Sequence, residues 1–388
     1  MESHPHVIVI SFLLKCRSPN GEIQLKIIAR TIILSCATIF LFIVFKAVYN
    51  GVQSNRPLIK PQSLNQYQII DKDFNKIVDV PFTSITSFKG NADYIYMSVD
   101  QESPTRLDNK IVQYNRKTQK YASIFNSKFK MPSVQGVELN DNWLVWVDAD
   151  ESGWQLNPYF MNLKTLEIQP LTKENEENVF NDFPVLIGDY SAWIKMNRKS
   201  EEAEVMLKNL KTNETTSIFK LNNFTSLSAK DGKLLFTDKK DHFRYIYLYD
   251  LKSKEIKEFK SSYEFIGWAR LLNDQQWVYL TFGDPSEPST GDGKLIFYDA
   301  EANRSQEVVS DIDSVSELNT DFNNNVFLYF NDNGFYKKFK IKDHLLVEDG
   351  LLKTHYFLRF SAENGIYIYD QELPNEKYKL IIQSELPN

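Results

Sequence analysis

Apolar and polar residues alternate along much of the chain beyond residue 66, and a period of two predicts β-strands. The clearest case is the segment 246–259. There Tyr247 and Tyr249 alternate with Ile246 and Leu248, a polar turn follows, and a second partly apolar stretch completes the segment. Aromatic and β-branched side chains pack well on a pleated, half-buried surface, so we expect a β-hairpin here.

Hairpins of this kind return along the chain, and an Asn or Asp marks the turn each time: Asn115, Asn162, Asn209, Asp250 and Asp299. The spacings between these landmarks are 47, 47, 41 and 49 residues. A repeat of roughly forty to fifty residues that consists of short strands is typical of a β-propeller. The pattern therefore predicts an all-β fold organised as blades around an axis.

Each repeat also contains a more apolar strand before its hairpin, and a turn rich in Gly, Asn and Asp precedes most of these strands. Seven such strands are present, at 94–99, 143–147, 192–196, 233–237, 277–282, 326–330 and 366–369. Another short strand before each turn brings the repeat to four strands. We therefore predict seven four-stranded blades, with six or eight as the alternative because the stretch 326–383 is compressed.

The two ends of the repeat region are incomplete. After the strand at 366–369 only one further strand, at 378–383, remains, which leaves the last blade one strand short. Near the start, the strands at 67–70 and 76–80 have no inner strands of their own. We expect an N-terminal strand to complete the last blade, because closing the ring removes an exposed sheet edge.

The segment 27–48 differs from the rest because it is almost continuously apolar, with Arg30 and Lys46 near its ends. As a helix these residues would extend about 33 Å, enough to cross a hydrocarbon core of about 30 Å. We predict a retained transmembrane anchor; the alternatives are a cleaved signal peptide and a lipoprotein modified at Cys36. Mild positive charge before the segment favours a cytoplasmic tail at 1–26, with the C-terminal domain outside the cytoplasm in a single-pass topology.

A polar linker at 49–66 then joins this anchor to the propeller domain, which we place at 67–388. The net charge of the chain is −6, and the residues after position 49 carry 40 basic and 49 acidic groups. This balance argues against nucleic acid as a partner, because binding phosphates requires a basic face. Both cysteines, Cys16 and Cys36, precede the propeller, so we expect neither disulfides nor thiolate metal sites in it.

Two blades carry a recognisable repeat motif. An apolar strand that ends at Trp146-Val-Asp148 is followed by a polar loop and by a strand that ends in Asn162-Leu-Lys-Thr165, and the stretch from Phe236 to Lys254 has the same order. This pattern resembles the propeller repeats of TolB-like proteins and of the dipeptidyl-peptidase N-terminal domain. The usual Ser-Pro-Asp-Gly turn is replaced by variants, and no peptidase domain follows. The resemblance implies a propeller fold and an exported, interaction-type role, without an activity.

Motifs for catalysis or metal binding are weak. The Gly-x-Ser-x-Gly motif of a nucleophile elbow is absent, and the histidines of the predicted propeller show no ligand spacing. The run from Asp148 to Gly153 resembles the first half of a calcium loop, but Tyr159 stands where the bidentate Glu should be. We therefore predict no metal and no cofactor, and the sequence leaves open whether there is any catalysis.

An acidic or amide residue follows almost every second strand of a blade, and these turns project on one face of a propeller. Such residues either hold the turns by local hydrogen bonds or form a docking face for a basic partner. The candidate binding residues on this face are Asp100, Asp148, Asp150, Trp154, Asp238, Asp284 and Asp332.

These observations predict an extracytoplasmic binding or scaffold module for a protein, peptide or cell-envelope component, with the membrane as a further partner through residues 27–48. The alternative is a propeller enzyme, a glycan lyase or hydrolase that uses carboxylates in the central funnel. A purely structural domain of a membrane complex is the third possibility.

Overall fold

The structure is a computed structural model that describes residues 76–383, apart from the stretches 83, 101–107, 175, 224, 241–242, 262, 264, 282–292, 313–314, 331–334, 354–359, 364–365 and 374–376. The predicted tail, anchor and linker, together with Asp284 and Asp332, therefore lie outside the described residues. Contacts divide the chain into the units Met1–Asp71 and Lys72–Asn388, and every described residue belongs to the second. Within this described part, no helix has the length and apolar character needed to cross a bilayer.

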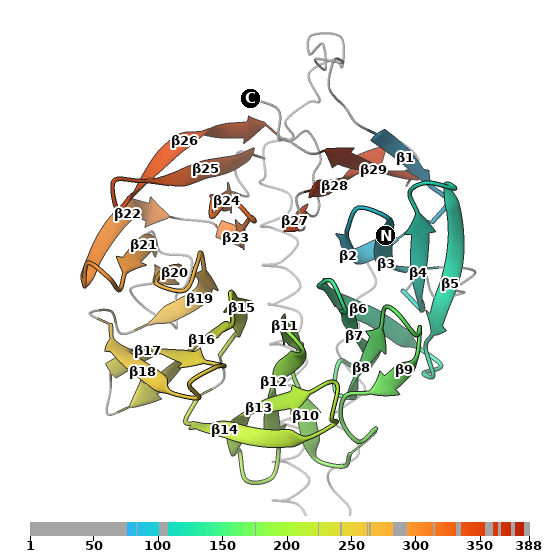
Figure 1. Ribbon diagram of the computed structural model, residues 1–388, viewed down its shortest axis with the longest axis horizontal. Coiled ribbons are helices and arrows are strands. Elements are labelled where there is room, and N and C mark those ends of the chain that lie inside the picture. Colours follow the sequence, from blue (N-terminus) through green and yellow to red (C-terminus); the bar gives the residue numbers. More distant parts are fainter. Residues whose placement is uncertain are drawn as a thin grey trace, which may run out of the picture. The chain divides into compact units, whose positions relative to one another are not determined.

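The strands of the described residues form seven antiparallel sheets that follow one another in chain order around a ring (Figure 1). The first three sheets contain β2 (Ile85–Gly90), β3 (Tyr94–Val99), β4 (Lys110–Asn115) and β5 (Lys120–Asn126); β6 (Pro132–Leu139), β7 (Trp143–Asp150), β8 (Leu156–Asn162) and β9 (Ile168–Pro170); and β10 (Val179–Asn181), β11 (Val185–Ile187), β12 (Tyr190–Asn197), β13 (Ala203–Asn209) and β14 (Thr215–Leu221). The next three contain β15 (Ser228–Lys230), β16 (Lys233–Lys240), β17 (Phe243–Asp250) and β18 (Ile256–Lys260); β19 (Ile266–Leu271), β20 (Gln276–Thr281), β21 (Gly293–Asp299) and β22 (Arg304–Ile312); and β23 (Val315–Thr320), β24 (Val326–Phe330), β25 (Phe335–Lys342) and β26 (Leu345–Lys353).

The seventh sheet joins the two ends of this unit. Its strand order is β1-β29-β28-β27, in which β27 (Phe360–Glu363), β28 (Ile366–Leu373) and β29 (Lys377–Gln383) come from the end of the chain, and β1 (Lys76–Val80) comes from the start. Val78 of β1 lies opposite Leu380 of β29, and both side chains are buried in one apolar cluster. The prediction that an N-terminal strand completes the last sheet is confirmed.

The Asn and Asp landmarks of the repeat hold the hairpins between the third and fourth strands. The side-chain oxygen of Asn115 accepts hydrogen bonds from the backbone N–H groups of Lys117 and Thr118, at 3.0 and 2.8 Å. Asn162, Asn209 and Asp250 hold their turns by the same pair of bonds. Four residues after each landmark the backbone φ is positive, at Gln119, Leu166, Asn213, Lys254 and Asn303. The landmark spacing is therefore the spacing of one repeated turn.

The apolar core lies between neighbouring sheets, and a repeated aromatic group contributes to it. In the second sheet, Trp146 of β7 stacks on Tyr159 of β8 with an interplanar angle of 18°, and Phe125 from the preceding sheet packs edge-on against Trp146. The same arrangement recurs further along the ring, in the groups Phe219–Phe236–Tyr247 and Phe259–Trp277–Tyr298. The aromatic residues that mark the strands in the sequence therefore serve the contact between sheets.

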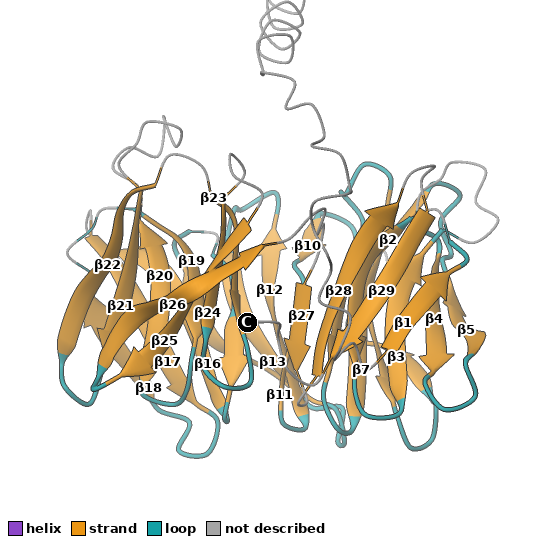
Figure 2. Ribbon diagram, turned by 90° about the horizontal axis from the view of Figure 1, so that it is seen from above, coloured by secondary structure: helices purple, strands orange, loops and turns teal. Residues whose placement is uncertain are grey.

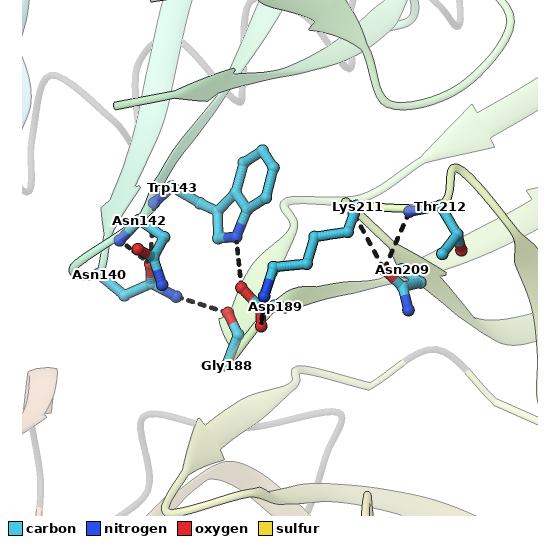
Figure 3. A network of polar contacts seen from close by, with 8 residues as sticks. All are labelled: Asn140, Asn142, Trp143, Gly188, Asp189, Asn209, Lys211 and Thr212. Atoms are coloured by element: carbon cyan, nitrogen blue, oxygen red, sulfur yellow. Dashed lines mark hydrogen bonds and ion pairs between the residues drawn. The ribbon is translucent and has the colours of Figure 1, made fainter. Parts of the chain in front are cut away.

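The turns gather at the two opposite ends of the sheets (Figure 2), and polar contacts there tie neighbouring sheets together. Figure 3 shows one such group between the second and third sheets. The Asn140 side-chain amide donates to the carbonyl of Gly188 at 2.8 Å, and the Trp143 indole donates to Asp189 at 3.0 Å. Lys211 pairs with the same carboxylate at 2.5 Å, and these contacts hold the pKa of Asp189 below its ordinary value.

Candidate functional site

Asp148, one of the predicted binding residues, lies two residues before the end of β7 and is completely buried. Its carboxylate accepts hydrogen bonds from the Ser127 hydroxyl at 2.5 Å and from the backbone N–H of Lys128 at 3.1 Å. Burial raises the pKa of the Asp148 carboxyl, while these two hydrogen bonds act to lower it. Both donors belong to the segment that leads from one sheet into the innermost strand of the next.

Asp238 and Asp100 repeat this role in other sheets. Asp238 of β16 is 1% exposed and accepts backbone hydrogen bonds from Asn222 and Asn223, both in the segment before β15. Asp100, directly after β3, is 7% exposed and accepts the backbone N–H of Ser84 at 2.6 Å, just before β2. In all three sheets the carboxylate fastens the segment that enters the innermost strand.

Asp150 is the last residue of β7, and Trp154 lies in the loop that follows. The Asp150 carboxylate accepts the backbone N–H groups of Trp154 and Gln155, at 3.0 and 2.9 Å, and so closes the loop. The Trp154 side chain is 61% exposed, and the guanidinium of Arg198 lies 4.8 Å from the centre of its ring. Among the described residues, no three His, Cys, Asp or Glu side chains converge in a way that could hold a metal ion.

A cavity of about 650 Å³ lies between the innermost strands of the ring. Residues from β2, β6, β11, β15, β19 and β23 line it, so six of the seven sheets contribute. Its aromatic surface comes from Phe183, Trp268 and Phe322. The charged side chains that line it are Lys89, Glu138, Lys230, Asp231, Arg270 and Asp321. The lining is therefore mixed, with charges of both signs beside aromatic and aliphatic groups.

Most of these charges have partners within the chain. The Lys89 ammonium lies 3.2 Å from the Glu138 carboxylate, which joins the first sheet to the second. Lys230 donates to the backbone carbonyl of Asp321 at 2.8 Å and to the Asn324 side chain at 2.7 Å. The Asp321 carboxylate is 2% exposed and accepts hydrogen bonds from Asn325 and from the Tyr367 hydroxyl.

Arg270 of β19 differs from these groups. Its guanidinium donates to the Ala269 carbonyl at 3.1 Å, and it forms no ion pair with any residue in the described part of the chain. Burial lowers the pKa of Arg270, while the nearby charges of Glu138 and Glu317 act to raise it. The residue keeps some accessible surface, yet its charged group is largely desolvated, because it lies deep in a concave lining.

Two further polar groups of the same cavity lack hydrogen-bond partners among the described residues. The hydroxyl oxygen of Ser226, just before β15, and the amide nitrogen of Asn319 in β23 are both shielded from solvent, and neither makes a hydrogen bond to the described residues. Buried polar groups in proteins are normally paired. With Arg270, they give the cavity three polar groups with unused hydrogen-bonding capacity on three neighbouring sheets.

From the sequence we predict, for the enzyme alternative, carboxylates in the central funnel, but no particular residue of this cavity. A signal was present in β19, where Trp268 and Arg270 alternate with the core residues Ala269 and Leu271. In a strand of period two, such alternation places Trp268 and Arg270 on one face and the two core residues on the other. Trp268 also packs against the core cluster that includes Leu318.

Comparisons with known proteins bear on the fold. No family model matches the chain, and no curated protein matches it in sequence. The β-propeller domain of the Trilobed protease from Pyrococcus furiosus is 13% identical with a TM-score of 0.55, over 78% of this chain and 93% of that one. An oligogalacturonate lyase from Vibrio parahaemolyticus is 12% identical with a TM-score of 0.55, over 79% and 96%. TolB from Acinetobacter baumannii is 12% identical with a TM-score of 0.43, over 77% and 79%.

The chain is therefore a β-propeller, and the resemblance to peptidase propeller repeats is confirmed at the level of the fold. The similar structures include both a lyase and the propeller domain of a protease, so the shared architecture is that of a propeller module. At 12–13% identity this likeness concerns the fold alone.

Proposed function

We propose that the chain is a ligand-binding or scaffold module, in which each of the seven sheets serves as one blade and the central cavity holds the ligand. The ligand is a segment of a protein, a peptide or a cell-envelope component. One observation carries this proposal: the 650 Å³ cavity presents a desolvated guanidinium, Arg270, that has no ion-pair partner in the described part of the chain. A concave site with apolar walls and a few convergent polar groups is the usual form of a binding site.

A photo-crosslinking pair tests whether the cavity is the binding site. Phe183 lines the cavity and is 40% exposed, whereas Phe243 at the start of β17 is 46% exposed and does not line it. Each position is replaced by p-benzoylphenylalanine in the full chain, in its native membrane. We expect a specific crosslinked product from position 183 that position 243 does not give. Identical products from both positions, or products from 243 alone, would refute the cavity as the site.

The proposal includes a membrane anchor at 27–48, a cytoplasmic tail at 1–26 and an extracytoplasmic propeller. The apolar length of the segment 27–48 supports it, as does the excess of basic residues before that segment. A reporter that matures only outside the cytoplasm is fused after Asn388. Activity of this reporter is the expected result, and cytoplasmic fluorescence of a matched fluorescent fusion would contradict the topology.

Catalysis on a glycan, by a lyase or a hydrolase, is the second candidate function. Glu138 favours it, because this carboxylate lines the cavity, is 37% exposed, and lies beside the Lys89 ammonium. A positioned carboxylate can transfer protons in such reactions. The full chain is incubated with polysaccharides while unsaturated products and new reducing ends are measured. If the chain turns over a polysaccharide and Glu138→Gln abolishes this activity, the protein is an enzyme and not only a binding module.

A further inference from the structure

Arg270 is the one cation of the cavity lining whose charged group has no side-chain partner in the described residues. Lys89 pairs with Glu138, and Lys230 donates to the neighbouring turn of the sixth sheet. The guanidinium of Arg270 has five N–H groups, and one hydrogen bond to a protein group is formed, to the carbonyl of the preceding residue. Its remaining donors are therefore available to a ligand.

The two acids near Arg270 are themselves engaged. Glu138 pairs with Lys89, and Glu317 of β23 accepts a hydrogen bond from the Tyr336 hydroxyl. Neither forms an ion pair with Arg270, although both charges act on its pKa. A buried charge without close compensation is costly for a fold, and a binding site is one setting in which such a cost is retained.

We propose that Arg270 binds a carboxylate group of a short peptide segment, with Asn319 and Ser226 completing the contact. This inference rests on the proposed function, because it assigns the ligand of the same cavity. A guanidinium matches the planar, two-oxygen shape of a carboxylate. The Asn319 amide and the Ser226 hydroxyl can each donate to a carboxylate oxygen once their side chains turn toward the cavity. Both groups are buried in the same lining without partners among the described residues.

The neighbouring charges favour a singly charged anion. A phosphate carries up to two negative charges near neutral pH, and Glu138 and Glu317 would repel it more strongly than they would repel one carboxylate. A peptide also fits the rest of the lining, where Phe183, Trp268 and Phe322 provide apolar surface for side chains. A volume of 650 Å³ falls within the range of small-ligand sites, so a few residues of a chain can enter.

The test is affinity selection by the full-length protein in detergent micelles. The probe is a mixture of N-acetylated tetrapeptides, prepared once as free acids and once as C-terminal amides, and retained peptides are identified by mass spectrometry. We expect at least tenfold enrichment of carboxylate-bearing peptides over their amide counterparts. Enrichment of the free acids alone would assign the C-terminal carboxylate, whereas enrichment of Asp and Glu within the amides would assign a side chain.

Three variants make the result specific. Arg270→Met keeps the side-chain length without the charge and should lose the enrichment. Arg270→Lys keeps the charge without the planar fork and should retain only part of it. Arg304→Met is the matched control, because Arg304 of β22 donates to the His344 carbonyl outside the cavity. Circular dichroism of each variant verifies the fold.

Several outcomes would overturn the inference. Unchanged enrichment with Arg270→Met would show that the carboxylate is bound elsewhere, and selection of neutral or cationic peptides would show that the ligand class is wrong. Retention of a trigalacturonate probe in place of all peptides would assign a glycan acid. Crosslinking from position 183 would survive each of these failures, so failure of the inference is distinguishable from failure of the proposed function.

Discussion

Asp148, Asp238 and Arg270 are all charged groups withdrawn from water, but the chain supplies several hydrogen-bond partners only to the two aspartates. Asp148 and Asp238 accept hydrogen bonds from the segments that enter the innermost strands of their own sheets. Arg270 has one backbone carbonyl and no ion pair among the described residues. Burial alone therefore does not distinguish a charged group that supports the fold from one that binds a ligand. The number of hydrogen-bond and ion-pair partners within the fold distinguishes them.

Among the charged groups, the largest expected effect tests the structural half of this comparison. Replacing Asp148 with Ala leaves the Ser127 hydroxyl and the Lys128 N–H without their acceptor in a buried place. We expect the free energy of unfolding to fall by about 3 kcal/mol, measured by urea denaturation. Asp150→Ala, at the end of the same strand, is the control, and its loss should be about 1 kcal/mol because its hydrogen bonds lie in an exposed turn. Equal losses would show that burial of these bonds does not decide their contribution.

Asp182, between β10 and β11, is half-buried. Its carboxyl accepts a backbone hydrogen bond from Phe183 and has no side-chain partner among the hydrogen bonds of the described residues. Burial raises its pKa to about 6, against about 4 in the unfolded chain. Ionisation therefore destabilises the native state as pH rises from 4 through 6. Asp182→Asn should leave stability at pH 4 nearly unchanged and raise it by about 2 kcal/mol at pH 8. Thermal unfolding across this pH range measures the difference, and an equal gain at both pH values would contradict the assignment.

Arg270→Met tests the other half of the comparison through stability instead of binding. The substitution removes the cost of desolvating the guanidinium, and it also removes the attraction of Glu138 and Glu317. These effects oppose each other, so we expect the free energy of unfolding to change by less than about 1 kcal/mol. Urea denaturation of the full chain measures it. If the free energy of unfolding falls as much as with Asp148→Ala, Arg270 supports the fold and is not primarily a binding residue.

The smallest expected effect concerns Trp154. Because its side chain is 61% exposed, Trp154→Ala should lower the free energy of unfolding by about 0.5 kcal/mol, chiefly through its contact with Arg198. Trp146→Ala, at a fully buried and stacked position, should cost about 4 kcal/mol and provides the reference in the same denaturation series. A comparable loss at both positions would show that the Trp154 loop is part of the core.

The repeat itself was predictable from the sequence because each residue that marks it has a role in the structure of its own turn or strand. A landmark such as Asn162 caps its own hairpin, and the residue four positions later, Leu166, adopts the positive φ of that turn. The aromatic alternation around Tyr247 reports a strand that packs against the neighbouring sheet. Even the closing strand at Lys76–Val80 could be inferred, because the last sheet lacked one member.

The candidate site was not predictable in the same way. Ser226, Arg270 and Asn319 are dozens of residues apart and belong to the surroundings of three short strands, so no local pattern connects them. The sequence instead drew attention to Asp100, Asp148 and Asp238, whose regular spacing reflects a repeated structural bond. A residue type that recurs at the same position in several blades serves the structure of each blade, whereas a binding residue occurs in one blade only.

The sequence by itself determined the strands, their turns and the closure of the ring, because hydrophobic period and turn chemistry act over a few residues. Only the tertiary structure decided which charges have partners. Lys89 pairs with Glu138 on the next sheet, and Lys230 donates to a turn of the sixth sheet. Arg270 has no side-chain partner in the described part of the chain. The physical reason is that ion pairing depends on distances of a few ångströms between segments far apart in sequence, and the ring alone sets those distances.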